Sequence, residues 1–256
     1  MNLGFIGTGR ITSSVIIGIF QSKIKFSKII ISPRNKRKAK YLKKRFSKII
    51  IAKDNQEIID NCKWVFLGIT PKVGKKILKK LNFISNQTIV SFISTITISQ
   101  LKELIKVKAN IVRAIPLPPI SLKKGPVPIY PPNKKVKIFF NKIGSTIEIK
   151  NEKLSTNFWA TSGMMASYYE ILKVMSEWLI KKGIKREDTQ RYITSLFLAL
   201  SEDAVVNYKK DLKFLVNDSQ TPKGLNEQGL KEMKKRKVYK SIINTLNNIY
   251  KRLNKK

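Results

Sequence analysis

The 256-residue sequence contains no histidine and a single cysteine, Cys62. Without histidine there is no serine–histidine triad, and one cysteine alone cannot build a zinc site from the usual nitrogen and sulfur ligands. Most hydrolase mechanisms and a metal centre of this kind are thereby excluded. One cysteine also excludes an internal disulfide framework and favours a reducing, cytoplasmic location.

Long apolar runs are missing as well. No run reaches the roughly 18 residues that a membrane-spanning helix needs, so we expect no membrane association. The apolar stretch near the N-terminus is broken by glycines and by Arg10, and no charged leader precedes it. We therefore expect no secretory signal. Hydrophobic residues still make up 42% of the chain, as in an ordinary globular protein.

Acidic residues are scarce. There are 16 Asp and Glu against 52 Lys and Arg, which gives a formal net charge of +36. Such a charge attracts polyanions in general. The basic residues are spread along the whole chain, however, and no signature of a nucleic-acid-binding fold is present. We therefore expect no specific nucleic-acid partner.

The first motif is a glycine-rich turn between a strand and a helix. Residues 2–12 read NLGFIGTGRIT, an apolar strand that leads into a Gly-x-Gly turn, and an amphipathic helical pattern follows. In this setting Gly7 makes the tight turn and Gly9 lets the backbone approach a pyrophosphate, which the first amides of the helix bind. Thr12 occupies the position of the third glycine, so the dinucleotide-binding fingerprint is incomplete.

A second segment selects between NAD and NADP. NAD sites place a carboxylate about 20 residues beyond the glycine turn, where it holds the ribose 2′-hydroxyl. Here the predicted strand at residues 28–31 runs into SPRNKR, which contains no carboxylate. Arg34 can pair with a 2′-phosphate in two parallel hydrogen bonds, and Ser32 can hydrogen-bond the same group. The sequence therefore predicts NADP(H) as the cofactor.

Short β-rich runs alternate with helical patterns through the first 150 residues. This alternation is typical of a doubly wound parallel sheet of the Rossmann type. From residue 151 onward the strand signals stop. We therefore expect an α/β protein with an NADP-binding Rossmann-type domain at 1–150 and an all-helical substrate and dimerisation domain at 151–256. Beyond the first strand, the predicted strands are residues 28–31, 48–51, 64–69, 88–93, 111–115, 127–130 and 146–149.

The helical part carries an apolar stripe. It runs from Met165 to Leu179 at alternating spacings of three and four residues, and Gly183 can end this helix. A second helix is expected over residues 188–206 and at least one more after Gly224. We interpret the methionine and aromatic side chains of the stripe as core or subunit-interface positions. Long helices in so small a domain indicate packing against a second subunit, as a homodimer or a larger homo-oligomer.

Taken together, these motifs resemble the pyrroline-5-carboxylate reductase family, and the resemblance covers nearly the whole chain. GFIGTG at 4–9 is similar to the cofactor turn of that family, and SPRN at 32–35 is similar to its NADP-phosphate loop. LGITPK at 67–72 and RAIP at 113–116 continue the match, and TPKGLNEQGL at 221–230 aligns without gaps with a late loop and helix start. The resemblance implies hydride transfer from NADPH to a cyclic imine, with pyrroline-5-carboxylate of proline biosynthesis as the first candidate, by a homodimer with interlocking helical domains.

The resemblance and the turn together define a predicted site. Asn55, for example, lies where the family has an asparagine near the adenosine side of the cofactor. No catalytic acid or base can be named, because Tyr168, Tyr169 and Thr221 are candidates by position or chemistry alone. The predicted cofactor-binding residues are Gly7, Thr8, Gly9, Arg10, Ile11, Ser32, Arg34, Asn35, Asn55, Ile69, Thr70 and Pro71, and the predicted substrate-binding residues are Pro116, Thr221, Gly224 and Asn226.

Three segments depart from the family pattern on the substrate side. Residues 115–119 read IPLPP where the family has MPNTP, and residues 161–165 read TSGMM where it has GSGPA. Leu225 and Asn226 replace the paired threonines that hold the substrate carboxylate in the family. Each lost charged hydrogen bond weakens binding by roughly 1.5–3 kcal/mol. An anion can still bind at the helix start after Pro222.

These departures leave two further functions open. One is a reductase of the wider hydroxyacid dehydrogenase-like group with another substrate. Such enzymes use a lysine on a long helix between the domains, and Lys173 lies well inside the predicted helix at 165–179. The other is a non-catalytic protein that binds or senses NADP.

Overall fold

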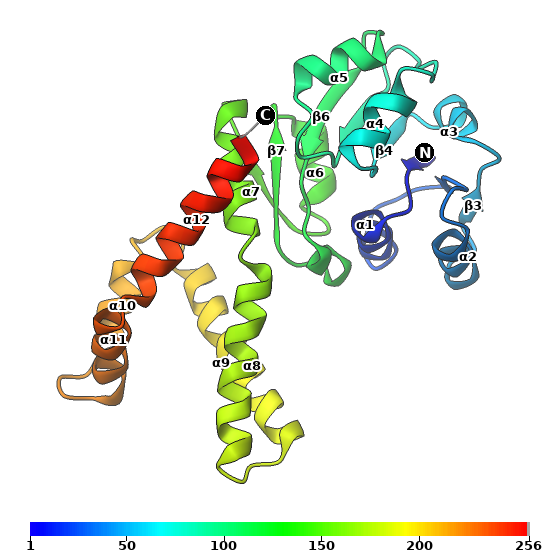
Figure 1. Cartoon of the computed structure of the whole chain (residues 1–256). Coiled ribbons are helices and arrows are strands. Elements are labelled where there is room, and N and C mark those ends of the chain that lie inside the picture. Colours follow the sequence, from blue (N-terminus) through cyan, green and yellow to red (C-terminus); the bar gives the residue numbers. More distant parts are fainter. Residues whose placement is uncertain (255–256) are drawn as a thin grey trace. The chain divides into compact units, whose positions relative to one another are not determined.

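The computed structural model describes residues 1–254, and the chain divides into two compact units (Figure 1). The first unit is Met1–Trp159, and the second begins at Ala160. The first contains the sheet, and the second is helical. An α/β fold with a Rossmann-type sheet followed by a helical part is therefore confirmed.

One sheet organises the first unit. Its strands lie in the order β3-β2-β1-β4-β5-β6-β7-β8. The order reverses between β1 and β4, and such a switch point opens a crevice outside the carboxyl ends of the strands. Each strand predicted from the sequence overlaps an observed one. The strands are β1 (Leu3–Ile6), β2 (Ile29–Ile31), β3 (Ile49–Ile51), β4 (Trp64–Leu67), β5 (Thr88–Ser91), β6 (Asn110–Ala114), β7 (Pro126–Tyr130) and β8 (Ser145–Glu148).

Helices cover both faces of this sheet. One apolar core includes buried residues of α1, α2 and α6, such as Ile16, Leu42 and Phe140, and the other includes buried residues of α3, α4 and α5, such as Ile58 and Leu101. Burial on both faces explains why the strands read as continuous Ile and Val runs. The helices are α1 (Arg10–Phe20), α2 (Lys36–Arg45), α3 (Asn55–Asn61), α4 (Pro71–Leu78), α5 (Ile98–Ile105) and α6 (Lys134–Phe140).

The sheet departs from the predicted parallel arrangement at one pair of strands. β6 and β7 pair antiparallel, whereas the other neighbours pair parallel. A parallel return needs a crossover of about a dozen or more residues, usually a helix. The segment between β6 and β7 offers only the proline-rich 3₁₀ helix η1 (Pro118–Leu122), which packs against α1. Thr97 and Gln100 form a capping box at the start of α5.

The second unit leaves its apolar stripe uncovered in the single chain. On α8, Tyr168 is 40% exposed and Met175 is 37% exposed. Of the two interpretations of this stripe, core or subunit interface, the exposure favours the interface. None of the helices within residues 1–254 has the length and apolarity needed to cross a membrane. The remaining elements are η2 (Glu152–Leu154), α7 (Ser155–Ser162), α8 (Met165–Lys181), α9 (Arg186–Val206), α10 (Lys213–Asp218), α11 (Leu225–Lys235) and α12 (Val238–Asn254).

Candidate functional site

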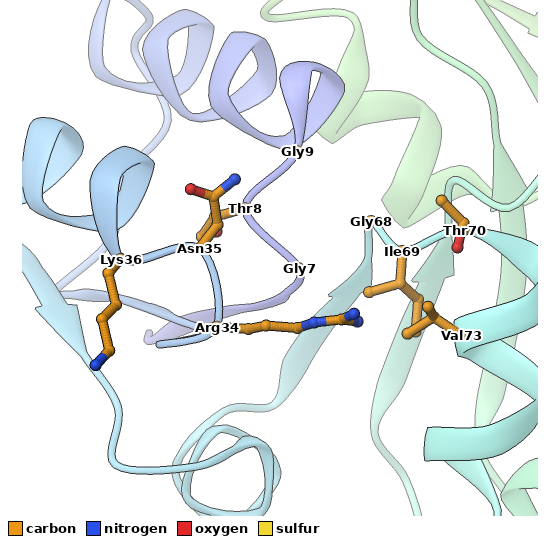
Figure 2. A pocket seen from close by; sticks show the side chains of 10 residues that line it. All are labelled: Gly7, Thr8, Gly9, Arg34, Asn35, Lys36, Gly68, Ile69, Thr70 and Val73. Atoms are coloured by element: carbon orange, nitrogen blue, oxygen red, sulfur yellow. The ribbon is translucent and has the colours of Figure 1, made fainter.

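A pocket of about 520 Å³ lies at the switch point, where the segments after β1, β2 and β4 meet. This size falls in the usual range for small-molecule sites. In Figure 2 the Arg34 side chain extends from its loop toward Ile69, on the far side of the glycine turn. The pocket is lined by Gly7, Thr8, Gly9, Arg34, Asn35, Lys36, Gly68, Ile69, Thr70 and Val73.

The glycine turn fits the backbone of a dinucleotide. Gly7 has φ +98°, and a Cβ there would lie 2.5 Å from the Gly68 carbonyl oxygen, so only glycine is accommodated. Gly9 is the N-cap of α1, and a Cβ there would meet its nearest neighbour, the same oxygen, at 3.7 Å. The space beside Gly9 is therefore open toward the pocket and the first amides of α1. A pyrophosphate fits such a cradle at a helix start.

The missing third glycine of the fingerprint has a structural compensation. Thr12 is buried on α1, and a Cβ on Gly68 would lie 2.0 Å from the Thr12 Oγ1. The third glycine of the fingerprint allows a helix to pack closely on a strand. Here the small residue is Gly68, at the end of β4, and the side chain is on the helix. The helix and the strand therefore still approach closely, but the glycine that allows it is on the strand side and not on the helix.

Ser32 and Asn55 hold the glycine turn in place through hydrogen bonds. The Ser32 hydroxyl accepts a hydrogen bond from the Gly7 amide at 2.9 Å and donates one to Asn55 Oδ1 at 2.5 Å. Ser32 is 2% exposed, so this hydroxyl joins the glycine turn, the end of β2 and the start of α3. Its one hydrogen is committed to Asn55. The direct contact between Ser32 and a 2′-phosphate stays a prediction, and the bracing role was missed because it depends on three distant segments.

The rim of the pocket after β2 is cationic. Arg34 and Lys36 are exposed there, and Asn35 caps α2 by accepting a hydrogen bond from the Lys38 amide at 3.2 Å. None of the residues that line the pocket carries a carboxylate. A monoester phosphate fits this rim, because cations neutralise it and no acid repels it. The residues present therefore fit NADP(H) better than NAD(H).

The structure brings together most of the predicted cofactor-binding residues. Those that line the pocket are Gly7, Thr8, Gly9, Arg34, Asn35, Ile69 and Thr70. The predicted residues outside the lining are Arg10 and Ile11 at the start of α1, Pro71 at the start of α4, and the bracing residues Ser32 and Asn55. Lys36, Gly68 and Val73 line the pocket without having been predicted, although their neighbours in the two motifs were the signal for all three.

The predicted substrate-binding residues fall in both units. Pro116 is buried after β6 in the first unit. The other three share the tight turn that starts α11 in the second unit, where the Gly224 amide donates to the Thr221 carbonyl at 2.8 Å. The Asn226 side-chain amide donates to the Ser219 carbonyl at 2.9 Å. Leu225 is 86% exposed beside it.

Lys173 does not have the environment of a catalytic base. Its ammonium lies 3.0 Å from a carboxylate oxygen of Glu170 and 4.0 Å from one of Glu177. The hydrogen bond to Glu170, followed by the charges of both glutamates, raises the pKa of Lys173 above its ordinary value. A base near neutral pH needs the opposite shift. The candidates Tyr168 and Tyr169 lie on the same helix and are exposed.

The switch-point pocket and its glycine turn define a dinucleotide-binding protein of the Rossmann type. Residues 2–95 match the family model described as NADP oxidoreductase coenzyme F420-dependent. Residues 152–256 match the model described as pyrroline-5-carboxylate reductase dimerisation. The resemblance to the pyrroline-5-carboxylate reductase family found in the sequence is therefore confirmed.

Individual relatives agree with this resemblance. Pyrroline-5-carboxylate reductase 3 of Danio rerio is 29% identical over 128 residues, which cover 49% of this chain and 44% of that protein. The protein of the same name from Xenopus laevis is 19% identical over 255 residues, covering 95% of this chain and 92% of its own. Plasmodium falciparum pyrroline carboxylate reductase, solved with NADP bound, has a similar fold. The TM-score is 0.82 at 20% identity, over 99% of this chain and 97% of that one.

Proposed function

We propose that this protein is an NADPH-dependent reductase that converts pyrroline-5-carboxylate, a cyclic imine, to proline. The observation that carries the proposal is the pocket at the sheet switch point. It combines a Gly7-x-Gly9 turn open to a pyrophosphate with a cationic, carboxylate-free rim at Arg34 and Lys36. The named relatives are pyrroline-5-carboxylate reductases, which supports this imine as the substrate.

The reduction of a protonated imine does not require a side chain that acts as an acid or a base. Bound NADPH would supply a hydride to the carbon of the protonated imine, whose π-electron pair would move to the nitrogen that already carries the proton, so that proline and NADP⁺ result. A protonated imine already carries the charge that makes its carbon electrophilic, and a chain without histidine can therefore serve. What the protein contributes is position: holding two reactants in the correct geometry can supply several kcal/mol of the barrier, up to roughly 7–11 kcal/mol.

The chain's own groups have separate tasks in this proposal. The amides at the start of α1 bind the pyrophosphate, and Arg34 with Lys36 binds the 2′-phosphate. Ser32 and Asn55 keep the turn in shape. Residues 1–150 then form the NADP-binding domain, and residues 151–256 hold the substrate carboxylate near Thr221, Gly224 and Asn226.

We also propose that the protein is a homodimer and works in the cytoplasm. The family model matched at residues 152–256 is a dimerisation model. Large apolar side chains of the helical unit are exposed in the single chain, among them Trp178 at 59%, Leu198 at 57% and Val205 at 68%. Apolar surface of this kind marks an interaction site. Cys62, the one cysteine, is a free buried thiol, which fits a reducing compartment.

Cofactor titration tests the phosphate rim. NADPH is expected to bind at least about tenfold more tightly than NADH, since one charged hydrogen bond contributes roughly 1.5–3 kcal/mol. Arg34→Ala should remove most of this difference. Arg37→Ala is the matched control, because Arg37 is an exposed cation three residues further along the chain, on α2, and it does not line the pocket. Equal affinities for the two cofactors in the native protein would refute the rim argument.

Turnover tests the substrate. NADPH oxidation is followed with pyrroline-5-carboxylate, and then with other cyclic imines and keto acids. Oxidation with pyrroline-5-carboxylate is the expected result. Oxidation of NADPH only with a different imine would support the reductase function and refute pyrroline-5-carboxylate as the substrate.

A non-catalytic NADP-binding protein is the second candidate, and one observation favours it. Where the family has paired threonines, Leu225 offers no donor, and the amide of Asn226 is already bonded to the Ser219 carbonyl. Tight NADPH binding without turnover on any of these compounds would establish this candidate.

A further inference from the structure

A buried arginine lies at the carboxyl end of β6. Arg113 is 4% exposed, and its guanidinium donates through Nη1 to Glu152 Oε1 at 2.5 Å. Nη2 donates to the Ser94 main-chain carbonyl. The Trp159 ring covers the guanidinium, with its centroid 5.5 Å from Cζ. We call this set of four residues the Arg113 cluster.

The Arg113 cluster joins segments that are far apart in the sequence. The Ser94 carbonyl, in the loop after β5, also accepts a hydrogen bond from Trp159 Nε1 at 3.2 Å. Glu152 Oε1 accepts a second hydrogen bond, from the Ile98 amide at the start of α5, at 2.9 Å. Three pieces of chain therefore depend on one guanidinium: the loop at 92–97, the first turn of α5, and the segment at 152–159.

The cluster lies at the same edge of the sheet as the cofactor pocket. Arg113 pairs in register with Ser91 at the end of β5, and β5 lies next to β4, whose following segment lines the pocket. A dinucleotide binds across the switch point, outside the carboxyl ends of the strands. With the 2′-phosphate bound at the rim after β2, the nicotinamide end would extend toward β4 and β5. The loop at 92–97, which follows β5, would then lie beside the reacting end of the cofactor.

Stability alone is a poor explanation for this cation. The side chains of Arg113 and Glu152 are 5% and 24% exposed, and replacing an ion pair with a buried member by apolar side chains is often neutral or stabilising. The Arg113 Nε, moreover, is buried and has no hydrogen-bond partner within residues 1–254. A buried cation kept with an unpaired donor indicates that its geometry has a use. Lysine cannot supply that geometry, because only the planar guanidinium of arginine can donate hydrogen bonds to two acceptors in fixed directions at once.

We propose that Arg113 is a positioning residue for hydride transfer, and this inference rests on the reductase function proposed above. Through Ser94 and Glu152 it holds the loop at 92–97 and the segment at 152–159 in one arrangement beside the nicotinamide. It does not touch the substrate. Its loss leaves NADPH binding in place and lowers the rate at which the bound pair reacts.

Two variants of the full-length protein test the inference. Arg113→Lys keeps the charge and loses the fork, whereas Glu152→Gln keeps an acceptor for Ile98 and loses the charge. Lys137→Gln is the matched control: it breaks a second pair in the same unit, Lys137 with Glu148 at 2.5 Å, whose side chains are 44% and 29% exposed. Two quantities are measured for each protein. One is amide hydrogen exchange by segment, and the other is the single-turnover rate of NADPH oxidation together with the dissociation constant of NADPH.

The expected result is local. In Arg113→Lys, amide exchange at 92–98 and 152–159 rises by about tenfold or more, while exchange in β1 and β4 is unchanged. The single-turnover rate falls by about tenfold to a hundredfold, because small misplacements of reacting groups have effects of this size. The NADPH dissociation constant stays within about threefold, as for an interaction that cofactor binding does not use. Glu152→Gln shows the same pattern more weakly, and Lys137→Gln shows none of it.

Two outcomes would overturn the inference. One is unchanged exchange and unchanged rate in both cluster variants. The other is faster exchange throughout the sheet together with weakened NADPH binding, which would make Arg113 a structural residue only. If the native protein binds NADPH and does not reduce pyrroline-5-carboxylate, the proposed function fails. The inference then falls with the proposed function. Where the native protein does reduce pyrroline-5-carboxylate, an unchanged single-turnover rate in Arg113→Lys refutes the inference alone.

Discussion

The exchanged packing of Thr12 and Gly68 predicts a steric coupling between α1 and the end of β4. Gly68→Ala would place a Cβ 2.0 Å from Thr12 Oγ1, while its next neighbours would be Thr12 Cβ at 3.4 Å and the Gly7 carbonyl at 3.6 Å. The first distance is far inside van der Waals contact, and the other two are ordinary. One hydroxyl therefore accounts for the conflict. Removing that hydroxyl should remove most of the penalty.

The size of the effect follows from the contacts. Overpacking a well-packed core costs about 1–3 kcal/mol, so Gly68→Ala should lower the free energy of unfolding by that amount. Thr12→Ala should cost less, because Thr12 Oγ1 is buried without a hydrogen-bond partner within residues 1–254. The double variant should recover most of the loss. The interaction energy then lies in the range of about 0.5–3 kcal/mol that is typical of residues in contact.

The assay is urea denaturation of the native protein and the three variants at one fixed subunit concentration, because association contributes to stability. A Gly68→Ala variant as stable as the native protein would refute the packing argument. So would a double variant no more stable than Gly68→Ala alone.

Gly9→Ala is a control that separates stability from binding. Its Cβ would approach the Gly68 carbonyl oxygen no closer than 3.7 Å, so the urea midpoint should not change. The same Cβ would enter the space for the pyrophosphate. NADPH should therefore bind about tenfold more weakly or worse, as for a lost charged hydrogen bond. A loss of stability instead would show that the space beside Gly9 is not open.

Three further predictions concern other parts of the molecule. Helix α2 reads KRKAKYLKKR, so NADPH binding should weaken as the salt concentration rises from about 0.05 to 0.3 M. Replacing Arg37, Lys40 and Lys44 by Gln should make the NADPH dissociation constant depend less on salt, whereas an equal loss of charge on α12 should leave this dependence unchanged. Leu225→Thr restores a hydroxyl at the start of α11 and should lower the KM for pyrroline-5-carboxylate by roughly tenfold, the equivalent of about 1.4 kcal/mol; an unchanged KM would argue against a carboxylate contact there. Burial raises the pKa of the Cys62 thiol from 9.0 to about 12, so native protein at pH 8 should resist alkylation that the unfolded chain undergoes. Because the folded pKa is the higher one, the stabilising effect is complete below pH 9 and is lost as the pH rises toward about 12, which urea midpoints across that range can measure.

Much of the fold was predictable because its signals are local. The Ile and Val runs of the strands, the capping box at Thr97 and the glycine turn each lie within a few neighbouring residues. The orientation of β7 was not predictable from periodicity, since a strand reads the same in both directions. The short connection through η1 carries the information, because it leaves no room for the helix that a parallel return needs.

The site was predictable to the extent that single segments form it. The turn at Gly7 and the rim at Arg34 lie in one pocket, as their motifs indicated. Three features join residues that lie far apart in the sequence. They are the packing of Thr12 against Gly68, the hydrogen bonds of Ser32 and the Arg113 cluster. Packing brings such residues together, and no pattern within a single segment carries that information.

The bond pattern at Ser32 limits how the cofactor choice of this protein can be redesigned. A common way to convert an NADP enzyme to NAD is to place an acid at the end of the second strand. At position 32 a carboxylate could still accept from the Gly7 amide, but it has no hydrogen to donate to Asn55 Oδ1 and would repel that oxygen. The turn needed by both cofactors would be damaged along with the preference. A substitution at Arg34, which lies on the exposed rim, would change the charge beside the ribose of the cofactor and leave the glycine turn intact.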